Sequence, residues 1–187
     1  LQNARRYREI QRHADQMATV AEIGRDLAAS LELNELMTRL AEKLHAIFNA
    51  RDTIIRLVEP DGTTFKTVTA VGEYASDFLA SVIRLGEGIS GSIAQSGIAE
   101  IIANPEKDAR ARHVAGTPDQ EEEPVTAMIV PFRSKGRSTG LILLYRAHKD
   151  GMFSQIDLDF LMAIARQAAD AVENARLFDM TQGLLKE

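Results

Sequence analysis

The sequence predicts an α+β fold in which a central antiparallel sheet is combined with amphipathic helices. Apolar residues recur at three- and four-residue steps near both ends of the chain, a spacing typical of helices with one buried face. Between these regions lie two pairs of apolar, β-branched runs, each joined by a short polar turn, which is the pattern of a β-hairpin. Strands joined by hairpins pair antiparallel, so we expect an antiparallel sheet with helices packed on it.

The composition is that of one ordinary domain with extensions. The chain has 187 residues, of which 45% are hydrophobic, enough for a substantial core. Its net charge of −5 argues against nucleic acid or an anionic membrane surface as the main partner. No long apolar run or signal peptide is visible, so we expect a cytoplasmic protein without membrane contact. The first residue is leucine, which suggests a fragment of a longer protein.

Residue types set limits on catalysis and metal binding. Cysteine is absent, which removes disulfides, thiolate metal sites and cysteine nucleophiles, and no two of the four histidines have the spacing H-x-x-x-H of a zinc site. Ser90 and Ser92 have no histidine nearby in sequence to act as a base. Asp108, Arg110 and His113 share one loop and could do acid–base work. We nevertheless favour a protein with no catalytic or metal-binding residues.

One long amphipathic helix is predicted for residues 1–30. Its apolar stripe is narrow and rich in alanine, and its opening turns are polar and basic. The stripe consists of Ile10, Ala14, Met17, Val20, Ala21, Leu27 and Leu31. Such a helix either lies on its own domain or pairs with its copy in a second subunit. We favour pairing for residues 1–13 and leave both arrangements open for residues 14–31.

A second helix and the first hairpin follow. Asn34 suits a helix N-cap, and the broad apolar face of residues 35–48 predicts a helix packed on the core. Residues 53–59 and 63–71 are strand-like runs separated by Asp61-Gly62, a tight-turn signal. A short helical turn is expected after the second strand.

The glycine-rich stretch 82–105 is the segment around which we expect the domain to be organised. An alternating apolar start predicts a short strand, and the glycines that follow it permit sharp turns. Ser90 suits the N-cap of a short helix over residues 91–95, Gly97 suits its C-cap, and residues 98–102 predict another strand. A glycine turn before a helix N-terminus leaves backbone N–H groups free for a ligand, although the same pattern also serves as a plain connector.

The remaining segments are a long loop, a second hairpin and a final helix. Residues 103–124 contain three prolines and no apolar period, and a loop of this length often covers a binding site, although for residues 118–124 we expect a disordered insertion. Residues 125–132 and 140–147 predict paired strands, the latter apolar on both faces and hence central in the sheet. A capping-box pattern at Ser154 then starts a helix that continues nearly to the last residue.

Three parts of this pattern together resemble the GAF domain family. The first is a run G-x-G-x-x-G and its sequel: Gly86, Gly88, Gly91, Ser96-Gly97, Asn104-Pro105, Asp108 and Arg110. The second is the closing hairpin, with Val130-Pro131-Phe132 before its polar turn and Gly140-Leu141-Ile142 after it. The third and most specific is the last helix, from Phe153 to Leu177. The resemblance covers residues 18–177.

The resemblance implies a layered domain related to PAS domains. The first, second and last helices would lie on one face of the sheet. The glycine-turn helix and the loop 103–117 would cover the other face. It also implies three parts along the chain: a coiled-coil-like helix extension over residues 1–17, the GAF-like domain over residues 18–177, and the start of a linker helix over residues 178–187.

The functions of the GAF family are mostly sensory, so the resemblance implies a regulatory module of a larger signal-transduction protein. The expected partners are a small molecule held between sheet and cover, a second copy in a homodimer, and a covalently attached kinase, cyclase or transcription regulator. The alternative is a dimerisation and relay module without a small ligand. Neither a ligand nor a cofactor can be named. Bilin attachment and methionine-sulfoxide reduction in this fold use cysteines, which are absent.

Two arginines within apolar strands are the first candidates for a ligand site. Arg56 and Arg146 lie in strands that are neighbours in the GAF fold, and a buried arginine needs an anion, an acid partner or a route to water. Either they reach solvent or an acid such as Glu59, Glu100 or Asp108, or at least one faces the pocket and holds a carboxylate or phosphate. The complete set of expected ligand-binding residues is Arg56, Ile89, Ser90, Ser92, Ile93, Asp108, His113 and Arg146.

Overall fold

A six-stranded antiparallel sheet is the centre of the computed structural model, which describes residues 2–28, 32–118 and 123–184. The strands are β1 (Asp52–Val58), β2 (Thr64–Gly72), β3 (Val82–Arg84), β4 (Glu100–Ile102), β5 (Val125–Ser134) and β6 (Arg137–Ala147). They are ordered β3-β2-β1-β6-β5-β4, so β1 and β6 occupy the middle. The sequence prediction of an α+β fold with an antiparallel sheet and β6 at its centre is therefore confirmed.

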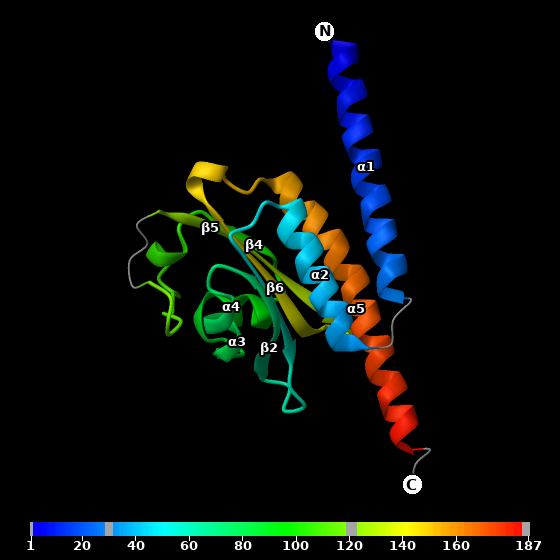
Figure 1. The fold of residues 1–187 in the computed structure, drawn as a ribbon, viewed down its shortest axis with the longest axis vertical. Helices are drawn as coiled ribbons and strands as arrows, with labels where there is room; N and C mark the ends of the chain where they lie inside the picture. The colour runs from blue at the N-terminus through cyan, green and yellow to red at the C-terminus, as the bar shows by residue number, and fades with distance from the viewer. Residues whose placement is uncertain (1, 29–31, 119–122, 185–187) are drawn as a thin grey trace.

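Helices cover both faces of this sheet, as the sequence predicted (Figure 1). One face carries α1 (Gln2–Ala28), α2 (Leu33–Ile47) and α5 (Gln155–Leu184). The other carries α3 (Ala75–Ala80), α4 (Gly88–Ser96) and the loop after β4. Each face has its own apolar core, and alternation along β1 divides them: Ile54 packs toward α4, whereas Ile55 and Leu57 pack toward the helical layer.

Two helices start at other residues than predicted, whereas the predicted start of a third helix is confirmed. α4 begins at Gly88 after Glu87, so Ser90 lies inside the first turn and is not its N-cap; Gly88, with φ of 67°, opens the helix three residues earlier. α2 begins at Leu33 rather than after Asn34. At α5, Ser154 and Asp157 form the predicted capping box, in which the Ser154 N–H donates to Asp157 Oδ2 over 2.8 Å.

The terminal helices extend beyond the sheet at opposite ends of the domain (Figure 1). The later turns of α1 pack on α5, where Ile23 and Leu27 are buried. The first turns have no such cover, and Tyr7 and Ile10 are 71% and 68% exposed. The boundary predicted between residues 17 and 18 therefore lies inside α1, which is continuous from Gln2 to Ala28. Residue 1, Leu31 of the apolar stripe, residues 119–122 of the predicted insertion and residues 185–187 of the predicted linker helix lie outside the described residues.

We predict that Gly91→Ala destabilises the domain even though it lies inside a helix. A Cβ at residue 91 would lie 2.2 Å from the carbonyl oxygen of Arg84, so β3 or α4 would have to shift. In an open helix the same change stabilises by about 1 kcal/mol. Here we expect a loss of about 2 kcal/mol in the free energy of unfolding, measured by urea titration. Gln95→Ala, on the exposed side of α4, is the control; a stabilised Gly91→Ala protein would contradict this packing.

Candidate functional site

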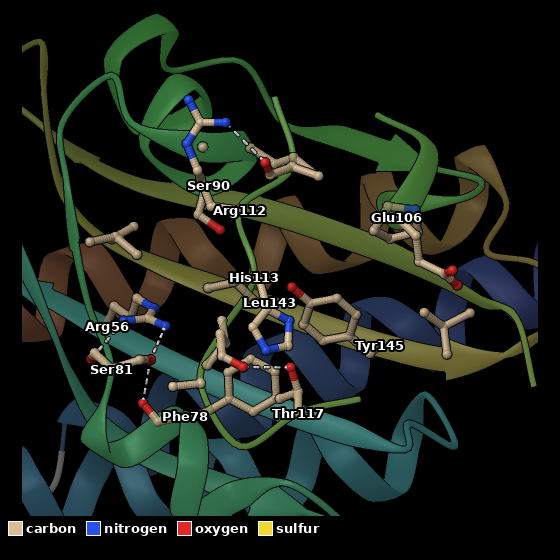
Figure 2. Close-up of a pocket in the computed structure, with 18 of the residues that line it drawn as sticks. Arg56, Phe78, Ser81, Ser90, Glu106, Arg112, His113, Thr117, Leu143 and Tyr145 are labelled. Atoms are coloured by element: carbon tan, nitrogen blue, oxygen red, sulfur yellow. Dashed lines mark hydrogen bonds between the residues drawn. The ribbon is translucent and has the colours of Figure 1, made fainter. Parts of the chain in front are cut away.

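A cavity of about 470 Å³ lies between the sheet and its cover, on the face opposite the three long helices (Figure 2). This volume is within the range of about 300–1,000 Å³ that is usual for small-molecule sites. β1 and β6 form its floor, and the end of α3, the first turn of α4 and residues 105–118 form its walls. Its polar or aromatic lining includes Arg51, Arg56, Phe78, Ser81, Ser90, Arg112, His113 and Tyr145.

Arg56 provides a buried positive charge on the cavity floor. Its side chain is on the same face of β1 as Ile54, as the period of two predicts, and the residue is only 1% exposed. Nη1 donates to the carbonyl oxygen of Ser81 over 3.0 Å, and Nη2 donates to Ser81 Oγ over 2.7 Å. The Nε–H group is buried without a hydrogen-bond partner among the described residues. Burial lowers the Arg56 pKa to about 10, so the guanidinium remains charged at neutral pH.

Ser81 holds this arginine in place from a distant part of the chain. The residue stands between α3 and β3, and its hydroxyl donates to the carbonyl oxygen of Phe78 over 2.7 Å. Thr67 on β2 also donates to the Ser81 carbonyl, over 3.3 Å. Neutral oxygens thus take two donors of Arg56, and no ion pair joins Arg56 to an acid within the described chain. Among the described residues the guanidinium therefore has no acid partner, and Arg56 does not pair with Glu59, Glu100 or Asp108.

Further charged groups stand around the cavity nearer its rim. Arg51 donates to Asp52 over 2.8 Å and lies 5.0 Å from the ring centre of Tyr74, so its charge is already engaged. Arg112 and His113 come from the cover loop and are exposed. The acids Glu87 and Glu106 also line the cavity, and Figure 2 shows Glu106. The deepest charge in the cavity is that of Arg56.

Aromatic and aliphatic groups form the rest of the floor. Phe78 and Tyr145 stack with their ring centres 5.6 Å apart and their planes at 20°. Leu143, on the same face of β6 as Tyr145, is 2% exposed. Burial raises the Tyr145 pKa, so its hydroxyl stays protonated at neutral pH and can donate a hydrogen bond. The site therefore combines one deep cation with a flat apolar wall.

Four of the eight predicted site residues line this cavity: Arg56, Ile89, Ser90 and His113. Ile89 and Ser90 belong to the first turn of α4, whose N–H groups have no acceptor within the helix. Figure 2 shows Ser90 and His113 on different walls of the cavity. The sequence expectation that an arginine in a central strand faces the pocket thus applies to Arg56, and its role in binding remains a proposal.

The other four predicted residues lie outside the cavity lining, each for a physical reason. Ser92 donates to the Gly88 carbonyl within α4, and Ile93 is fully buried in the core beneath that helix. Arg146 points to the helical layer, because its position alternates with that of Tyr145. There it donates to the carbonyl oxygen of Phe48 over 2.9 Å and lies 4.2 Å from the Phe153 ring centre.

Asp108, the last of the four, is engaged in an ion-pair network. Arg110 contacts Asp108 Oδ2 over 2.9 Å and Glu100 Oε2 over 2.8 Å, which ties the cover loop to the edge strand β4. The hydrogen bonds from Arg110 lower the Asp108 pKa to about 2. The predicted cluster of Asp108, Arg110 and His113 is therefore divided: the first two brace the loop, and only His113 reaches the cavity.

Sequence reasoning did not select Ser81, Phe78 or Tyr145. Tyr145 could have been found, since strand alternation that sends Arg146 to one face sends its neighbour to the other. Nothing local marks Ser81 as the partner of an arginine 25 residues earlier. For metals, no group of three or more potential ligands gathers anywhere in the described ranges. No helix within the same ranges is both long and apolar enough to cross a membrane.

A comparison with known protein families shows to which family the chain belongs. The sequence model of the GAF domain matches residues 30–173, which is most of the chain. The protein therefore belongs to the GAF domain family, a domain found in signalling proteins.

Individual relatives are distant. The Nif-specific regulatory protein of Herbaspirillum seropedicae is 21% identical over 165 residues, which are 87% of this chain; the chain spans only 30% of that protein's length. The GAF domain of a phosphoenolpyruvate-protein phosphotransferase from Coxiella burnetii superposes with a TM-score of 0.75 at 14% identity, covering 88% of this chain and 96% of that one. A free methionine-R-sulfoxide reductase from Neisseria meningitidis gives 0.70 at 16%, covering 84% and 88%. These structures show that the fold is shared.

We predict that Asp108→Asn lowers thermal stability in a pH-dependent way. A carboxyl whose folded-state pKa is depressed contributes stability above its unfolded pKa and loses it as the pH falls through the folded value. With an ordinary value of 3.8 and a folded value of about 2, the contribution is complete above about pH 5 and disappears between pH 4 and 2. The melting-temperature gap between wild type and variant, measured by differential scanning calorimetry, should close over that window.

Asp159→Asn, an isosteric change on the exposed side of α5, is the matched control for this series. A gap between wild type and Asp108→Asn that stays constant from pH 7 to pH 2.5 would contradict the ionic role of Asp108.

Proposed function

We propose that this GAF domain is the ligand-sensing regulatory module of a larger signal-transduction protein, and that it binds a small anionic molecule between sheet and cover. The observation that carries the proposal is the buried Arg56 guanidinium, with an unpaired Nε–H, on the floor of a 470 Å³ cavity. An isolated buried charge is costly, and an anion entering the cavity would offset that cost. Ile89, Ser90 and His113 stand around the same space and are proposed to contact the ligand.

Contacts between the cavity floor and the last helix support a relay. Arg176 of α5 donates to the carbonyl oxygen of Val58 over 2.8 Å, two residues from Arg56 on the same strand. Lys135, in the β5–β6 turn, pairs with Glu173 of α5 over 3.0 Å. A displacement of β1 would therefore move α5 at Arg176. A displacement of the β5–β6 turn would move α5 at Glu173, one helical turn away. We propose that α5 passes it to an attached output domain, a kinase, cyclase or transcription regulator.

Similar proteins support the regulatory setting. The Herbaspirillum relative is a regulatory protein, and a methyl-accepting chemotaxis protein is 19% identical with a TM-score of 0.70. We propose a cytoplasmic, non-catalytic domain over residues 18–177, with a helical extension at 1–17 and the start of a linker helix at 178–187. Asp108, Ser92, Ile93 and Arg146 are proposed to act in support of the fold and not as direct ligand contacts.

A second candidate function is dimerisation and relay without a small ligand. It is favoured by apolar side chains exposed on both terminal helices: Tyr7, Ile10 and Met17 on α1, and Leu177, Phe178 and Met180 on α5. These are the faces on which amphipathic helices pair with a copy of themselves. The two candidates share the proposed homodimer and differ in whether the cavity is occupied.

We predict that the protein, purified without denaturation, carries a small anion that native mass spectrometry detects as added mass. Arg56→Gln should lose this mass, because the anion loses its buried counter-charge. Arg137→Gln, an exposed arginine outside the cavity, should keep it. A chain that shows only its own mass, and whose melting temperature no small anion raises, would contradict ligand sensing and leave the dimerisation module.

We predict that the intact chain is a homodimer and that a chain lacking residues 1–16 is a monomer or a much weaker dimer. Removing those residues deletes the exposed turns of α1 that carry Tyr7 and Ile10. Multi-angle light scattering measures both masses, and Ile10→Glu against Glu9→Gln separates the apolar contact from charge alone. An intact chain that remains monomeric at high micromolar concentration would contradict the assembly.

A further inference from the structure

We infer that the cavity is shaped for an aromatic monocarboxylic acid, whose carboxylate meets Arg56 and whose ring lies against the aromatic wall of Tyr145 and Phe78. This inference rests on the proposed ligand-binding function and names the chemical class of the ligand. Two independent features carry it: the number and depth of the positive charges, and the geometry of the aromatic pair. Figure 2 shows both sets of side chains around one space.

The charge arrangement favours an anion with a single charged group. Arg56 is the deep cation, at 1% exposure, and its Nε–H is the buried donor without a partner. Arg51 lies nearer the rim and is already paired with Asp52. The exposed Arg112 and the exposed acids Glu87 and Glu106 also line the cavity, so a second negative charge on the ligand would meet two acids and one further cation there. Di- and triphosphates and dicarboxylates therefore fit less well than a monocarboxylate.

The donors around Arg56 can satisfy a carboxylate. A carboxylate at the cavity floor would compensate the buried charge of the Arg56 guanidinium, which has no acid partner among the described residues. The Tyr145 hydroxyl belongs to the same cavity and is close enough to Arg56 for each to affect the other's pKa. The first turn of α4 adds N–H groups that lack helical acceptors, with Ser90 on the cavity side. A carboxylate has two oxygens for these donors, and an amide of the same shape has one acceptor fewer.

The aromatic pair favours a flat apolar body behind that carboxylate. Phe78 is 5% exposed and supports Tyr145 from one side, with 5.6 Å between ring centres and 20° between planes. Tyr145 itself remains partly exposed to the cavity, next to the apolar side chains Leu143, Val125 and Val114. A ligand ring placed on Tyr145 would extend an existing stack at the usual spacing of about 4.5–7 Å. An aliphatic chain would bury similar area without that gain.

The test compares probes matched in shape on the intact chain. After exhaustive dialysis, benzoate, benzamide, cyclohexanecarboxylate, glutarate and inorganic phosphate are titrated while the backbone amide NMR signals of residues 88–90 are followed. We expect benzoate to bind at least about tenfold more tightly than benzamide, which lacks the charge. It should bind about fivefold more tightly than cyclohexanecarboxylate, which lacks the π-face. Glutarate and phosphate should bind more weakly than benzoate.

Variants test whether Arg56 causes the preference for a carboxylate and whether Tyr145 causes the preference for an aromatic ring. Arg56→Gln should abolish the preference for benzoate over benzamide, whereas the exposed Arg137→Gln keeps it. Tyr145→Leu should abolish the preference for benzoate over cyclohexanecarboxylate, whereas Tyr145→Phe, which keeps the ring, retains it. Circular dichroism checks that each variant is folded. If Arg56→Gln does not fold, the probe preferences of the wild-type chain decide the matter alone.

The failure of this inference is distinguishable from failure of the proposed function. Glutarate or phosphate binding more tightly than benzoate at residues 88–90 would overturn the aromatic acid and leave an anion sensor. Equal affinity for benzoate and benzamide would also overturn it, as would signals that move elsewhere than at residues 88–90. The proposed function falls only on the separate result, in which the purified chain carries no small molecule and no anion raises its melting temperature.

Discussion

The charge of Arg56 in the middle strand of the sheet is the constraint on which the rest of this cavity depends. A guanidinium at 1% exposure needs compensation, and within the described residues its hydrogen-bond partners are two neutral oxygens of Ser81. Because Ser81 comes from the junction of α3 and β3, the arginine fixes where that corner of the cover sits. The same side chain thus shapes the cavity and places a buried positive charge on its floor.

The two faces of the sheet are specialised in different ways. The face beneath α1, α2 and α5 is packed with apolar side chains, and Arg146 is tied there to the Phe48 carbonyl group. The other face has a thinner cover of α3, α4 and a loop, and the cavity lies beneath it. Arg56 and Arg146 look alike in sequence because both interrupt apolar strands. Their different environments follow from the parity of their positions in β1 and β6.

Much of the fold could be predicted from the sequence because helix and strand periods are local signals. The element order, the central position of β6 and the capping box at Ser154 follow from such patterns. The start of α4 could not be placed, since Ser90 is a better N-cap by residue type than Glu87, and the turn at Gly88 decided otherwise. In the site, alternation predicted that Arg56 shares a face with Ile54, but it could not say which face of the sheet holds the cavity. Its partner Ser81 is a tertiary contact between distant segments, and no local pattern specifies it.

The attachment of α3 has a consequence for how the cavity opens. A helix of six residues has no stability of its own in water, so α3 is ordered only through contacts such as the Arg56–Ser81 bonds and the buried Phe78 ring. Breaking those contacts leaves the sheet intact, so we expect the α3–β3 corner to open locally before the whole domain unfolds. A molecule that enters by this route can bind or leave only while the corner is open, so its association and dissociation rates scale with the fraction of time that the corner is open. Arg56 therefore tunes access as well as charge.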